Sequence, residues 1–316
     1  MSDDRFRFDV PTAFVFPGQG SQKPGMGTPF YEGSARARDE LERLDEAVDF
    51  DLLDQCLEGD ADALRRTRTT QPTVFATGIA AHAAVVERLG RVPQYVTGHS
   101  LGQYTALAAA GGLDPEAGVA LVRRRGEVME RACEDVSGRM VAALFVSPEA
   151  VTRVCADDDE VDVAGFNGPR QTVISGTESA VAAVVGTLRD TTSGPCRFVD
   201  LEVSEPFHSP AMAPAEATFA DELRACSLAD GLQSAVVSDT TANVYEAPEC
   251  VVGDLESQIT ATIDWTGVVD TLRERGVEQY VEFPPSGTLG TLVAESHPDA
   301  RIVTLESPAD IAEIAR

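Results

Sequence analysis

One short stretch of the chain, GHSLG at 98–102, places a serine between two glycines at a spacing that suits a nucleophile. A β-type run at 94–97 precedes it, and an alanine-rich helical run over about 101–110 follows it. In this strand–turn–helix setting the G-x-S-x-G pattern exposes a serine on a turn too tight for larger neighbours. The N-terminus of the helix directs N–H groups and a positive dipole end toward the serine oxygen. We therefore predict that Ser100 is a nucleophile, with a glycine-flanked structural turn as the alternative.

A serine nucleophile needs a base, and the chain has four histidines from which to choose. Three are poorly placed, being in mid-helix, beside the serine in the chain, or in a predicted loop: His82, His99 and His297. His208 lies in the segment 203–210, where a predicted small domain returns to the large one. Clefts form at such junctions. We therefore predict that His208 is the general base.

Acyl chemistry at a serine also needs two backbone N–H groups to stabilise an oxyanion. The residue after the serine, Leu101, supplies one of them. The loop PGQGSQ at 17–22 follows an apolar strand at 12–16, and its glycines free backbone N–H groups, that of Gln19 among them. We predict that Gln19 and Leu101 form the oxyanion hole, and an ordinary turn is the alternative for the PGQGSQ loop.

The elements that position these residues follow an α/β pattern. Strands alternate with helices before and after residues 137–203, which predicts a mostly parallel sheet covered on both faces. Within 137–203 the order is β-α-β-β-α-β, as in a ferredoxin-like module. We predict a large domain over 1–136 and 204–316 with this small domain inserted at 137–203. Among the helices of the large domain, two are expected over 72–89 and 252–262.

The charge of the chain is strongly negative, because 52 acidic residues oppose 25 basic ones and give a net charge of −27. Such a surface repels phosphates, so we exclude nucleic acid as a partner. Lys23 is the single lysine. An acidic excess spread along the whole chain, with arginine in place of lysine, suggests adaptation to concentrated salt, which screens repulsion between carboxylates.

Other features of the composition point to a cytoplasmic protein. No apolar run approaches the roughly 20 residues of a membrane helix, and no signal-peptide pattern opens the chain. We therefore expect no membrane partner. The six cysteines are far apart and show no C-x-x-C spacing, which favours reduced thiols over disulfides or a zinc site.

Several motifs together resemble the malonyl-CoA:acyl-carrier-protein transacylase family, which includes the acyltransferase domains of polyketide synthases. They occur in the order FVFPGQGSQ (14–22), GMG (25–27), TQP (70–72), TGHSLGQYTALAAAG (97–111), RG (125–126) with Met129, FNGPRQTVISG (166–176) and VSEPFHSPAM (203–212). They span most of the chain, and several motifs in order are more specific than the serine pattern alone. The resemblance implies a hydrolase-like large domain that carries a ferredoxin-like insert.

The resemblance also implies roles for individual residues. Ser100 and His208 would be nucleophile and base, and Gln258 falls where the family orients the base through a backbone carbonyl. Arg125 would bind the free carboxylate of the malonyl group, since a guanidinium pairs with a carboxylate through two parallel hydrogen bonds. Asn167 and Phe207 would contact the substrate.

Two features stand apart from these assignments. Next to Arg125, the side chains of Arg123 and Arg124 point elsewhere on a helix and are expected to form a solvated patch. The sequence departs from the family at Gln103, where glutamate is usual, and at 284–287, where PPSG replaces a glycine-rich motif.

The function implied is transfer of a malonyl or similar acyl group from coenzyme A to the phosphopantetheine thiol of an acyl carrier protein. The reaction would pass through an ester on Ser100 and follow ping-pong kinetics. It needs no metal and no bound cofactor. Two alternatives stay open: a serine thioesterase or esterase of the same fold, and a degenerate, non-catalytic homologue that binds the carrier.

Overall fold

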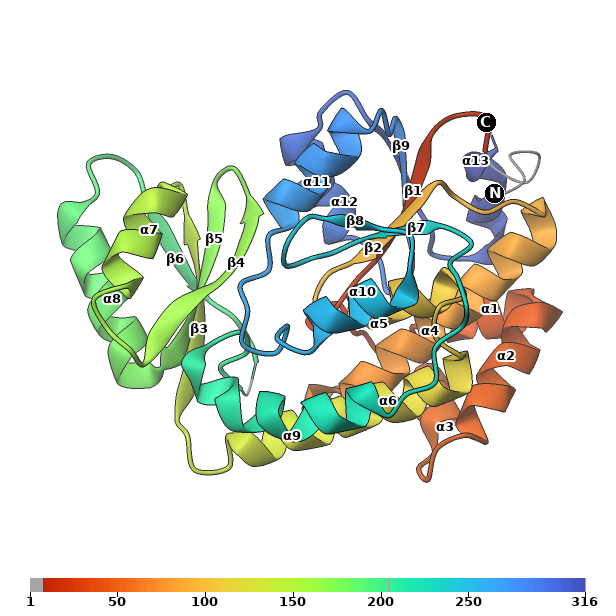
Figure 1. Ribbon diagram of the computed structural model, residues 1–316, viewed down its shortest axis with the longest axis horizontal. Helices are drawn as coiled ribbons and strands as arrows, with labels where there is room; N and C mark the ends of the chain where they lie inside the picture. The colour runs from red at the N-terminus through yellow and green to blue at the C-terminus, as the bar shows by residue number, and fades with distance from the viewer. Residues whose placement is uncertain (1–7, 204, 316) are drawn as a thin grey trace.

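The computed structural model describes residues 8–203 and 205–315, which form a six-stranded and a four-stranded sheet lying side by side (Figure 1). The larger sheet has the strand order β10-β9-β1-β2-β7-β8, and every neighbouring pair is parallel except β7 with β8. Its strands are β1 (Thr12–Phe16), β2 (Tyr95–Gly98), β7 (Ala235–Val237), β8 (Val244–Tyr245), β9 (Gln279–Glu282) and β10 (Arg301–Thr304). This is an α/β fold with a mixed, mostly parallel sheet.

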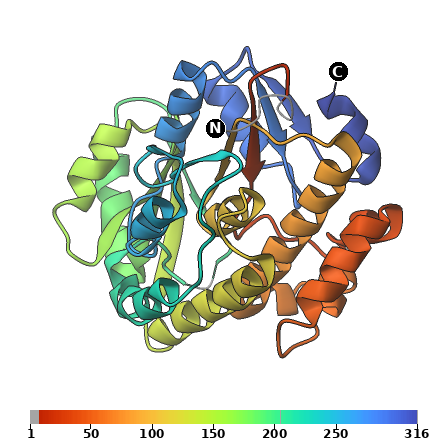
Figure 2. The same ribbon diagram turned by 45° about the vertical axis from the view of Figure 1, so that its right-hand side comes forward.

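Helices cover both faces of this sheet (Figure 2). The helices of this part of the molecule, some of which pack on other helices, are α1 (Thr28–Gly33), α2 (Ala35–Asp45), α3 (Leu52–Leu57), α4 (Thr67–Leu89), α5 (Gly102–Ala109), α6 (Pro115–Ala132), α9 (Ala213–Arg224), α10 (Pro248–Leu255), α11 (Trp265–Glu274), α12 (Leu289–Ser296) and α13 (Ile311–Ile314). The described residues also form the short 3₁₀ turns η2 (Ala63–Arg65), η3 (Pro210–Met212) and η4 (Pro308–Asp310).

The central strand β1 is buried along its whole length because both of its faces are covered. Phe14 and Phe16 point to the side of α4 and α5, where their rings pack against Phe283. Ala13 and Val15 point to the other side and join the core that α11 and α12 cover. The chain leaves β1 at its carboxyl end, next to the end of β2, so the 17–22 loop and the 98–102 turn emerge at the same edge.

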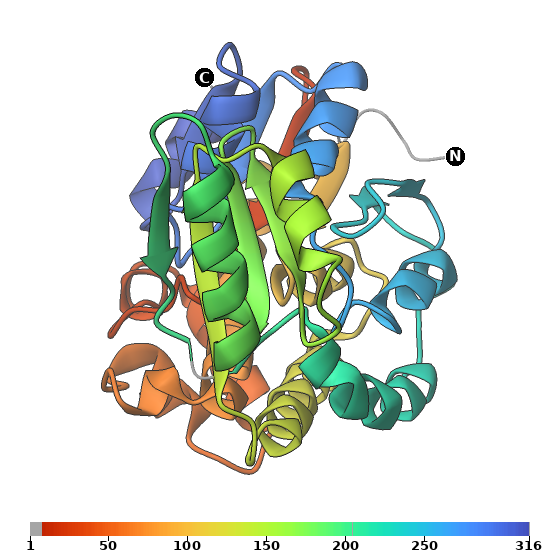
Figure 3. The same ribbon diagram turned by 90° about the vertical axis from the view of Figure 1, so that its left-hand side faces the viewer.

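The four-stranded sheet is antiparallel throughout, with the order β4-β5-β3-β6. It consists of β3 (Gly138–Leu144), β4 (Val161–Gly168), β5 (Gln171–Thr177) and β6 (Arg197–Asp200), with helices α7 (Pro148–Cys155) and α8 (Glu178–Thr191). Both helices lie on the outer face, as Figure 3 shows. Val141 and Ile174 pack under these helices, whereas Met140, Ala164 and Val173 on the inner face join the core of the larger sheet.

Two predicted helices differ from those observed. The helix expected over 72–89 begins earlier, at Thr67, and contains Pro72 in its first turns. Proline cannot donate to the carbonyl of Arg68, and the Arg123 guanidinium donates to that oxygen instead, at 2.7 Å. The helix expected over 252–262 begins at Pro248 and ends at Leu255, and residues 256–264 are irregular.

Candidate active site

The turn at 98–102 has the strained geometry that the sequence predicts. Ser100 has a φ of 52°, in the left-handed region, between the end of β2 and the start of α5. A Cβ at Gly98 would overlap the backbone of Gly102, and a Cβ at Gly102 would overlap the carbonyl of Phe16. Only glycine fits at both positions, so the chain can turn sharply enough to expose the Ser100 side chain.

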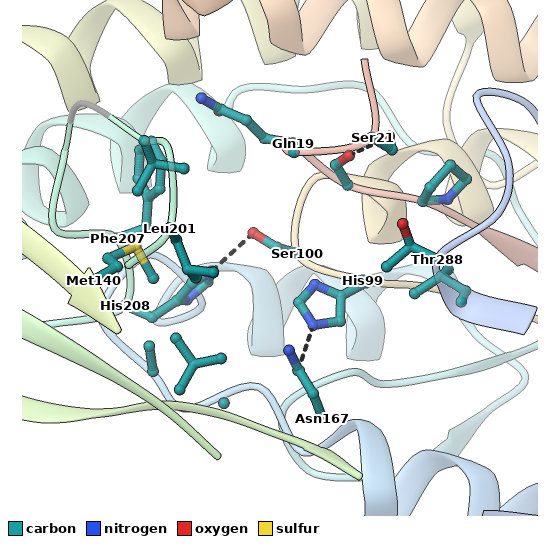
Figure 4. A pocket seen from close by; sticks show the side chains of 18 of the residues that line it. Gln19, Ser21, His99, Ser100, Met140, Asn167, Leu201, Phe207, His208 and Thr288 are labelled. Atoms are coloured by element: carbon teal, nitrogen blue, oxygen red, sulfur yellow. Dashed lines mark hydrogen bonds between the residues drawn. The ribbon is translucent and has the colours of Figure 1, made fainter. Parts of the chain in front are cut away.

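His208 meets this serine from a loop more than a hundred residues away. The two side chains point at one another in Figure 4, with 2.8 Å between Ser100 Oγ and His208 Nε2. On the other side of the ring, Nδ1 lies 3.0 Å from the carbonyl oxygens of both Gln258 and Ala261. Because carbonyls only accept, Nδ1 carries the proton and Nε2 is left to accept from the hydroxyl.

The electrostatic surroundings keep the His208 ring neutral. Burial, followed by the positive charge of Arg125, lowers the pKa of His208 to about 3. The bonds from Nδ1 to the two carbonyls work in the opposite direction but are the weaker influence. At neutral pH the imidazole is therefore in the form that can accept a proton.

Arg125 lies beside this pair and is only 1% exposed. Its Nη2 is 3.3 Å from Ser100 Oγ and 3.2 Å from Oε1 of Gln258, and its guanidinium lies over the ring of Tyr104. Within residues 8–203 and 205–315, no carboxylate forms an ion pair with it and its Nε has no partner. A buried guanidinium in this state is suited to an incoming anion.

Arg123 and Arg124, by contrast, form ion pairs with Glu127 at 3.2 and 3.3 Å and are partly buried between α6 and its neighbours, so they do not form the expected solvated patch. Arg124 also pairs with Glu222 at 2.7 Å. These two side chains are thus turned away from the site, as the helical geometry predicts.

The two segments predicted to form an oxyanion hole lie against each other. Gly18 packs so closely on the carbonyl of His99 that a Cβ there would overlap it, and this Cβ would lie 3.7 Å from the nitrogen of Leu101. Among the described residues, the backbone N–H groups of Gln19 and Leu101 have no hydrogen-bond acceptor. Nε2 of Gln19 donates to the Thr67 hydroxyl at 2.9 Å, which holds the loop in place.

Ser100, His208 and Arg125 line a cavity of about 240 Å³. The larger-sheet segments contribute Gln19, Thr288 and Leu292, and the inner face of the smaller sheet contributes Met140, Asn167 and Val173. Phe207 is 7% exposed and also lines it. Oδ1 of Asn167 lies 2.9 Å from Nε2 of His99, so Asn167 fixes a ring next to the serine (Figure 4). All the residues predicted for the site therefore lie at or directly behind one cavity.

Gln103, which departs from the motif, joins two strand ends behind the serine. Its Nε2 donates to the Val237 carbonyl at 2.9 Å, and its Oε1 accepts from Gly98 N at 3.1 Å. An amide donates and accepts at once, which a carboxylate cannot do. The substitution thus changes the charge but ties β2 to β7.

One buried acid at the site was missed by sequence reasoning. Asp239 follows β7 and accepts a hydrogen bond from the backbone N–H of Ser100 at 2.7 Å and others from the side chain of Gln258. A signal for it existed: a polar residue directly after a buried parallel strand lies at the edge where sites form. The sequence predicts a strand over 235–238, which Asp239 directly follows, but this position is not among the predicted site residues.

Comparison with known proteins places the chain in a family. Residues 13–299 match the acyl transferase domain family. The malonyl CoA-acyl carrier protein transacylase of Bacillus subtilis (strain 168) is 34% identical over 306 residues, which cover 95% of this chain and 94% of that protein. The protein of the same name from Synechocystis is 34% identical over 301 residues, 95% of this chain and 98% of that one.

Solved structures agree. The malonyl-CoA:acyl carrier protein transacylase from Xanthomonas oryzae has a TM-score of 0.91 at 33% identity and covers 98% of both chains. A matching chain from the complex of a type II PKS acyl-carrier protein with its malonyl-transacylase has a TM-score of 0.90 at 28% identity, over 95% of this chain and 97% of that one. The chain belongs to the acyl transferase domain family. Within that family it is similar, over nearly its whole length, to the malonyl-CoA:acyl carrier protein transacylases.

None of the helices formed by the described residues is long and apolar enough to cross a membrane.

Proposed function

We propose that this protein transfers a malonyl group from coenzyme A to the phosphopantetheine thiol of an acyl carrier protein. The observation that carries this proposal is the buried guanidinium of Arg125, without a carboxylate partner among the described residues, 3.3 Å from the Ser100 hydroxyl. A site that acts on uncharged acyl groups has no use for a buried cation at that position. The names of the relatives point to the same substrate and the same acceptor.

In the first half-reaction Ser100 Oγ attacks the carbonyl carbon of the malonyl thioester while His208 Nε2 accepts the hydroxyl proton. The oxyanion of the tetrahedral intermediate accepts hydrogen bonds from the N–H groups of Leu101 and Gln19. The C–S bond then breaks, and the sulfur of coenzyme A takes the proton from His208. The malonyl group remains as an ester of Ser100, with its free carboxylate bound by Arg125.

In the second half-reaction the phosphopantetheine thiol of the carrier protein enters the same cavity. His208 accepts the thiol proton as the sulfur attacks the ester carbonyl, and the same two N–H groups stabilise the second tetrahedral intermediate. The C–O bond breaks and Ser100 recovers its proton from His208. Coenzyme A thus leaves before the second thiol binds, so the kinetics are ping-pong, and no step requires a metal or a bound cofactor.

The two proposed domains contribute different parts of the site. We propose a hydrolase-like large domain over 1–136 and 204–316, with residues 137–203 as an inserted ferredoxin-like domain; residues 1–7, 204 and 316 lie outside the described part of the chain. Supporting this are the β-α-β-β-α-β order of the insert and its antiparallel strand order β4-β5-β3-β6. The large domain supplies the reacting groups, and the insert supplies one wall of the cavity.

The decisive experiment is intact-protein mass spectrometry after incubation with malonyl-CoA alone. A transferase accumulates one malonyl group per chain, on Ser100, and releases it when carrier protein is added. A thioesterase or esterase consumes malonyl-CoA continuously without an added thiol, and a non-catalytic homologue is not labelled. Either of the last two results would overturn the proposal.

Substrate choice is tested separately at Arg125. Replacing a guanidinium that binds a buried carboxylate costs about 2–5 kcal/mol, so Arg125→Ala should lower kcat/KM for malonyl-CoA by about 30-fold or more. The rate with acetyl-CoA, which has no carboxylate, should fall much less. Arg124→Ala, one residue away on the outside of α6, is the matched control and should leave both rates unchanged. Equal losses with both substrates would contradict the assigned role.

The cellular setting is also a proposal. We propose that the protein works in the cytoplasm and, given its net charge of −27, in concentrated salt. Salt near 1 M shortens the screening length to about 3 Å and so relieves repulsion between carboxylates. The melting temperature should then rise steeply with salt concentration, and full stability in dilute buffer would show that the acidic surface has another origin.

A further inference from the structure

We infer that Asp239 is a positioning residue that fixes the nucleophile, the base and the substrate-binding arginine relative to one another. The inference rests on the proposed function, because it takes Ser100, His208 and Arg125 to be the groups that carry acyl transfer. Asp239 touches neither the cavity nor the reacting atoms. It acts through the backbone of Ser100 and through the side chain of Gln258.

The first contact holds the strained turn. Asp239 Oδ2 accepts a hydrogen bond from Ser100 N–H at 2.7 Å, and the amide of Gln258 donates to the carbonyl of the same serine at 3.0 Å. The N–H of Ser100 is therefore anchored to Asp239, and its carbonyl is anchored both to Gln258 and to the Gln103 N–H, at 3.0 Å, in the first turn of α5. With φ at 52°, Ser100 is in a conformation that persists only when its surroundings determine it.

The second contact decides which way the Gln258 amide points. Nε2 of Gln258 donates to both oxygens of Asp239, at 2.9 and 3.1 Å. Both oxygens of Asp239, together with the Ser100 carbonyl at 3.0 Å, accept from this nitrogen and so select the NH₂ end of the amide. Oε1 must then face the opposite way, where it accepts from Nη2 of Arg125 at 3.2 Å. A reversed amide would place an NH₂ group against the guanidinium, so Asp239 indirectly sets the position of Arg125.

The third consequence concerns the base. The backbone carbonyl of Gln258 is one of the two acceptors that hold Nδ1 of His208. Residues 256–264 are irregular, so no helical ladder fixes this carbonyl, and the anchored side chain of Gln258 restrains the residue that carries it. One carboxylate thus lies behind all three functional groups.

The surroundings of Asp239 explain why a fold would keep an acid in this position. Asp239 is 1% exposed, and burial raises its pKa to about 7, against the opposing influence of Gln258, Ser100 and the charge of Arg125. Burial of a carboxyl group lowers the stability of the fold unless hydrogen bonds or ion pairs compensate for its lost hydration. Here each hydrogen bond of the carboxylate leads to Ser100 or Gln258, whereas the ion pairs of the buried Glu40 in α2, among the described residues, are with Arg36 and Arg43.

The test compares Asp239→Ala and Asp239→Asn in the rate of Ser100 acylation, with malonyl-CoA and with acetyl-CoA. Asparagine with its oxygen in place of Oδ2 keeps the two shorter bonds, at 2.7 and 2.9 Å, and loses only the longer one. We expect Asp239→Asn to stay within about tenfold of the wild type. Asp239→Ala should lower kcat/KM for malonyl-CoA by about 100-fold, the typical effect of a small misplacement of catalytic groups. It should also reduce the preference for malonyl over acetyl groups, because Arg125 is no longer held.

Two further variants separate positioning from folding. Asp239→Leu fills the volume that alanine leaves empty and should show the same loss of malonyl preference. Glu40→Ala removes a buried carboxylate far from the site, and should lower the melting temperature without changing the ratio of the two rates. The rescue by asparagine and the change in substrate ratio are effects that a merely structural acid would not produce.

The outcomes distinguish this inference from the proposed function. A wild-type protein that is not acylated on Ser100 overturns the proposed function itself. Normal acylation of the wild type with an unimpaired Asp239→Ala variant overturns the inference alone. So does a loss that is equal for both substrates and no smaller in Asp239→Asn, or a failure of both the alanine and the leucine variants to fold.

Discussion

The proposed nucleophile and base are held by two segments of very different kinds. The turn at 98–102 lies between a parallel strand and a helix, and its geometry follows from its own glycines. The holding segment at 256–264 has no regular structure, yet two of its carbonyls fix the His208 ring. In a helix those carbonyls would accept from N–H groups four residues later. The sharp turn at the nucleophile is thus permitted by local glycines and then anchored by Asp239 and Gln258, whereas the base is placed by an interruption of local structure.

The largest effects on acylation are expected from removing the two side chains that these segments position, those of Ser100 and His208. Ser100→Ala removes the atom that carries the acyl group, so labelling by malonyl-CoA should disappear. His208→Ala leaves the 98–102 turn intact but slows acylation by at least about 10⁴-fold, a typical loss for the base of such a pair. Both are measured by intact mass against time, with His297→Ala as a histidine control that keeps wild-type rates. Malonyl bound to a residue other than Ser100 would contradict the scheme.

A smaller but still large effect tests whether the turn depends on its glycines. A Cβ at position 102 would overlap the Phe16 carbonyl, which belongs to a buried strand that cannot move aside. Gly102→Ala should therefore lower the free energy of unfolding by about 3 kcal/mol or more. Gly253→Ala in α10 is the matched control, since no atom lies within 4 Å of the added Cβ. The Gly253→Ala change should raise the free energy of unfolding by up to about 1 kcal/mol, because alanine has less backbone freedom than glycine in the unfolded chain. Chemical denaturation measures both, and a stable Gly102→Ala variant would show that the turn tolerates a side chain.

The base should reveal its burial in the pH dependence of stability. The pKa of His208 is about 3 in the folded protein, against 6.5 for an ordinary histidine. Between these values the unfolded chain binds a proton that the folded chain refuses, so stability falls as pH drops below 6.5. From pH 8 to pH 5 the loss from this group is about 2 kcal/mol.

The variant His208→Gln should therefore lose less stability than the wild type over the same pH range. His82 is also buried, with a pKa lowered to about 4, but it is present in both proteins and cancels. Denaturant titrations at the two pH values measure the difference. Parallel losses in the two proteins would mean that His208 is protonated more easily than its surroundings indicate.

The same contrast explains what could be predicted from the sequence. The turn, the strand before it and the helix after it were all predictable, because glycine spacing and hydrophobic pattern are local properties. The helix expected over 252–262 was wrong beyond Leu255, because the contacts that interrupt it come from remote parts of the chain. Ile263 pairs with β4: its N–H donates to the carbonyl of Ala164, and its carbonyl accepts from the N–H of Phe166. Local propensity fails most often at functional sites, where tertiary contacts prevail.

The residues of the site also differ in how far the local sequence predicts them. Residues in dense motifs, such as Ser100, were predictable from neighbours in the sequence. The position of Asp239 after a buried strand is a sequence signal for a site, but its contact with Ser100 depends on β7 lying next to β2, a pairing that only the fold provides. Gln258 was placed by family resemblance, but the contact of its amide with Arg125 could not be inferred from any spacing.

The smallest expected effect tests whether remote contacts place the base. Thr262 donates its hydroxyl to the Val163 carbonyl of β4 at 2.8 Å, directly beside the Ala261 carbonyl that holds His208. Thr262→Val keeps the shape and removes this bond, which costs about 1 kcal/mol of stability. Because the acceptor of Nδ1 then moves more freely, acylation should slow several-fold while KM for malonyl-CoA stays the same.

Thr266→Val is the matched control for this change. It removes a similar bond to the same strand, from the Thr266 hydroxyl to the Phe166 carbonyl at 3.1 Å, but lies in α11, where it touches no acceptor of the base. Both variants should lose similar stability, and only Thr262→Val should lose rate. If the two lose rate equally, then the irregular segment is held by packing as a whole, and the remote hydrogen bond at Thr262 does not set the orientation of His208. A rate loss confined to Thr262→Val would instead trace the position of the base to a single contact between the holding segment and the smaller sheet.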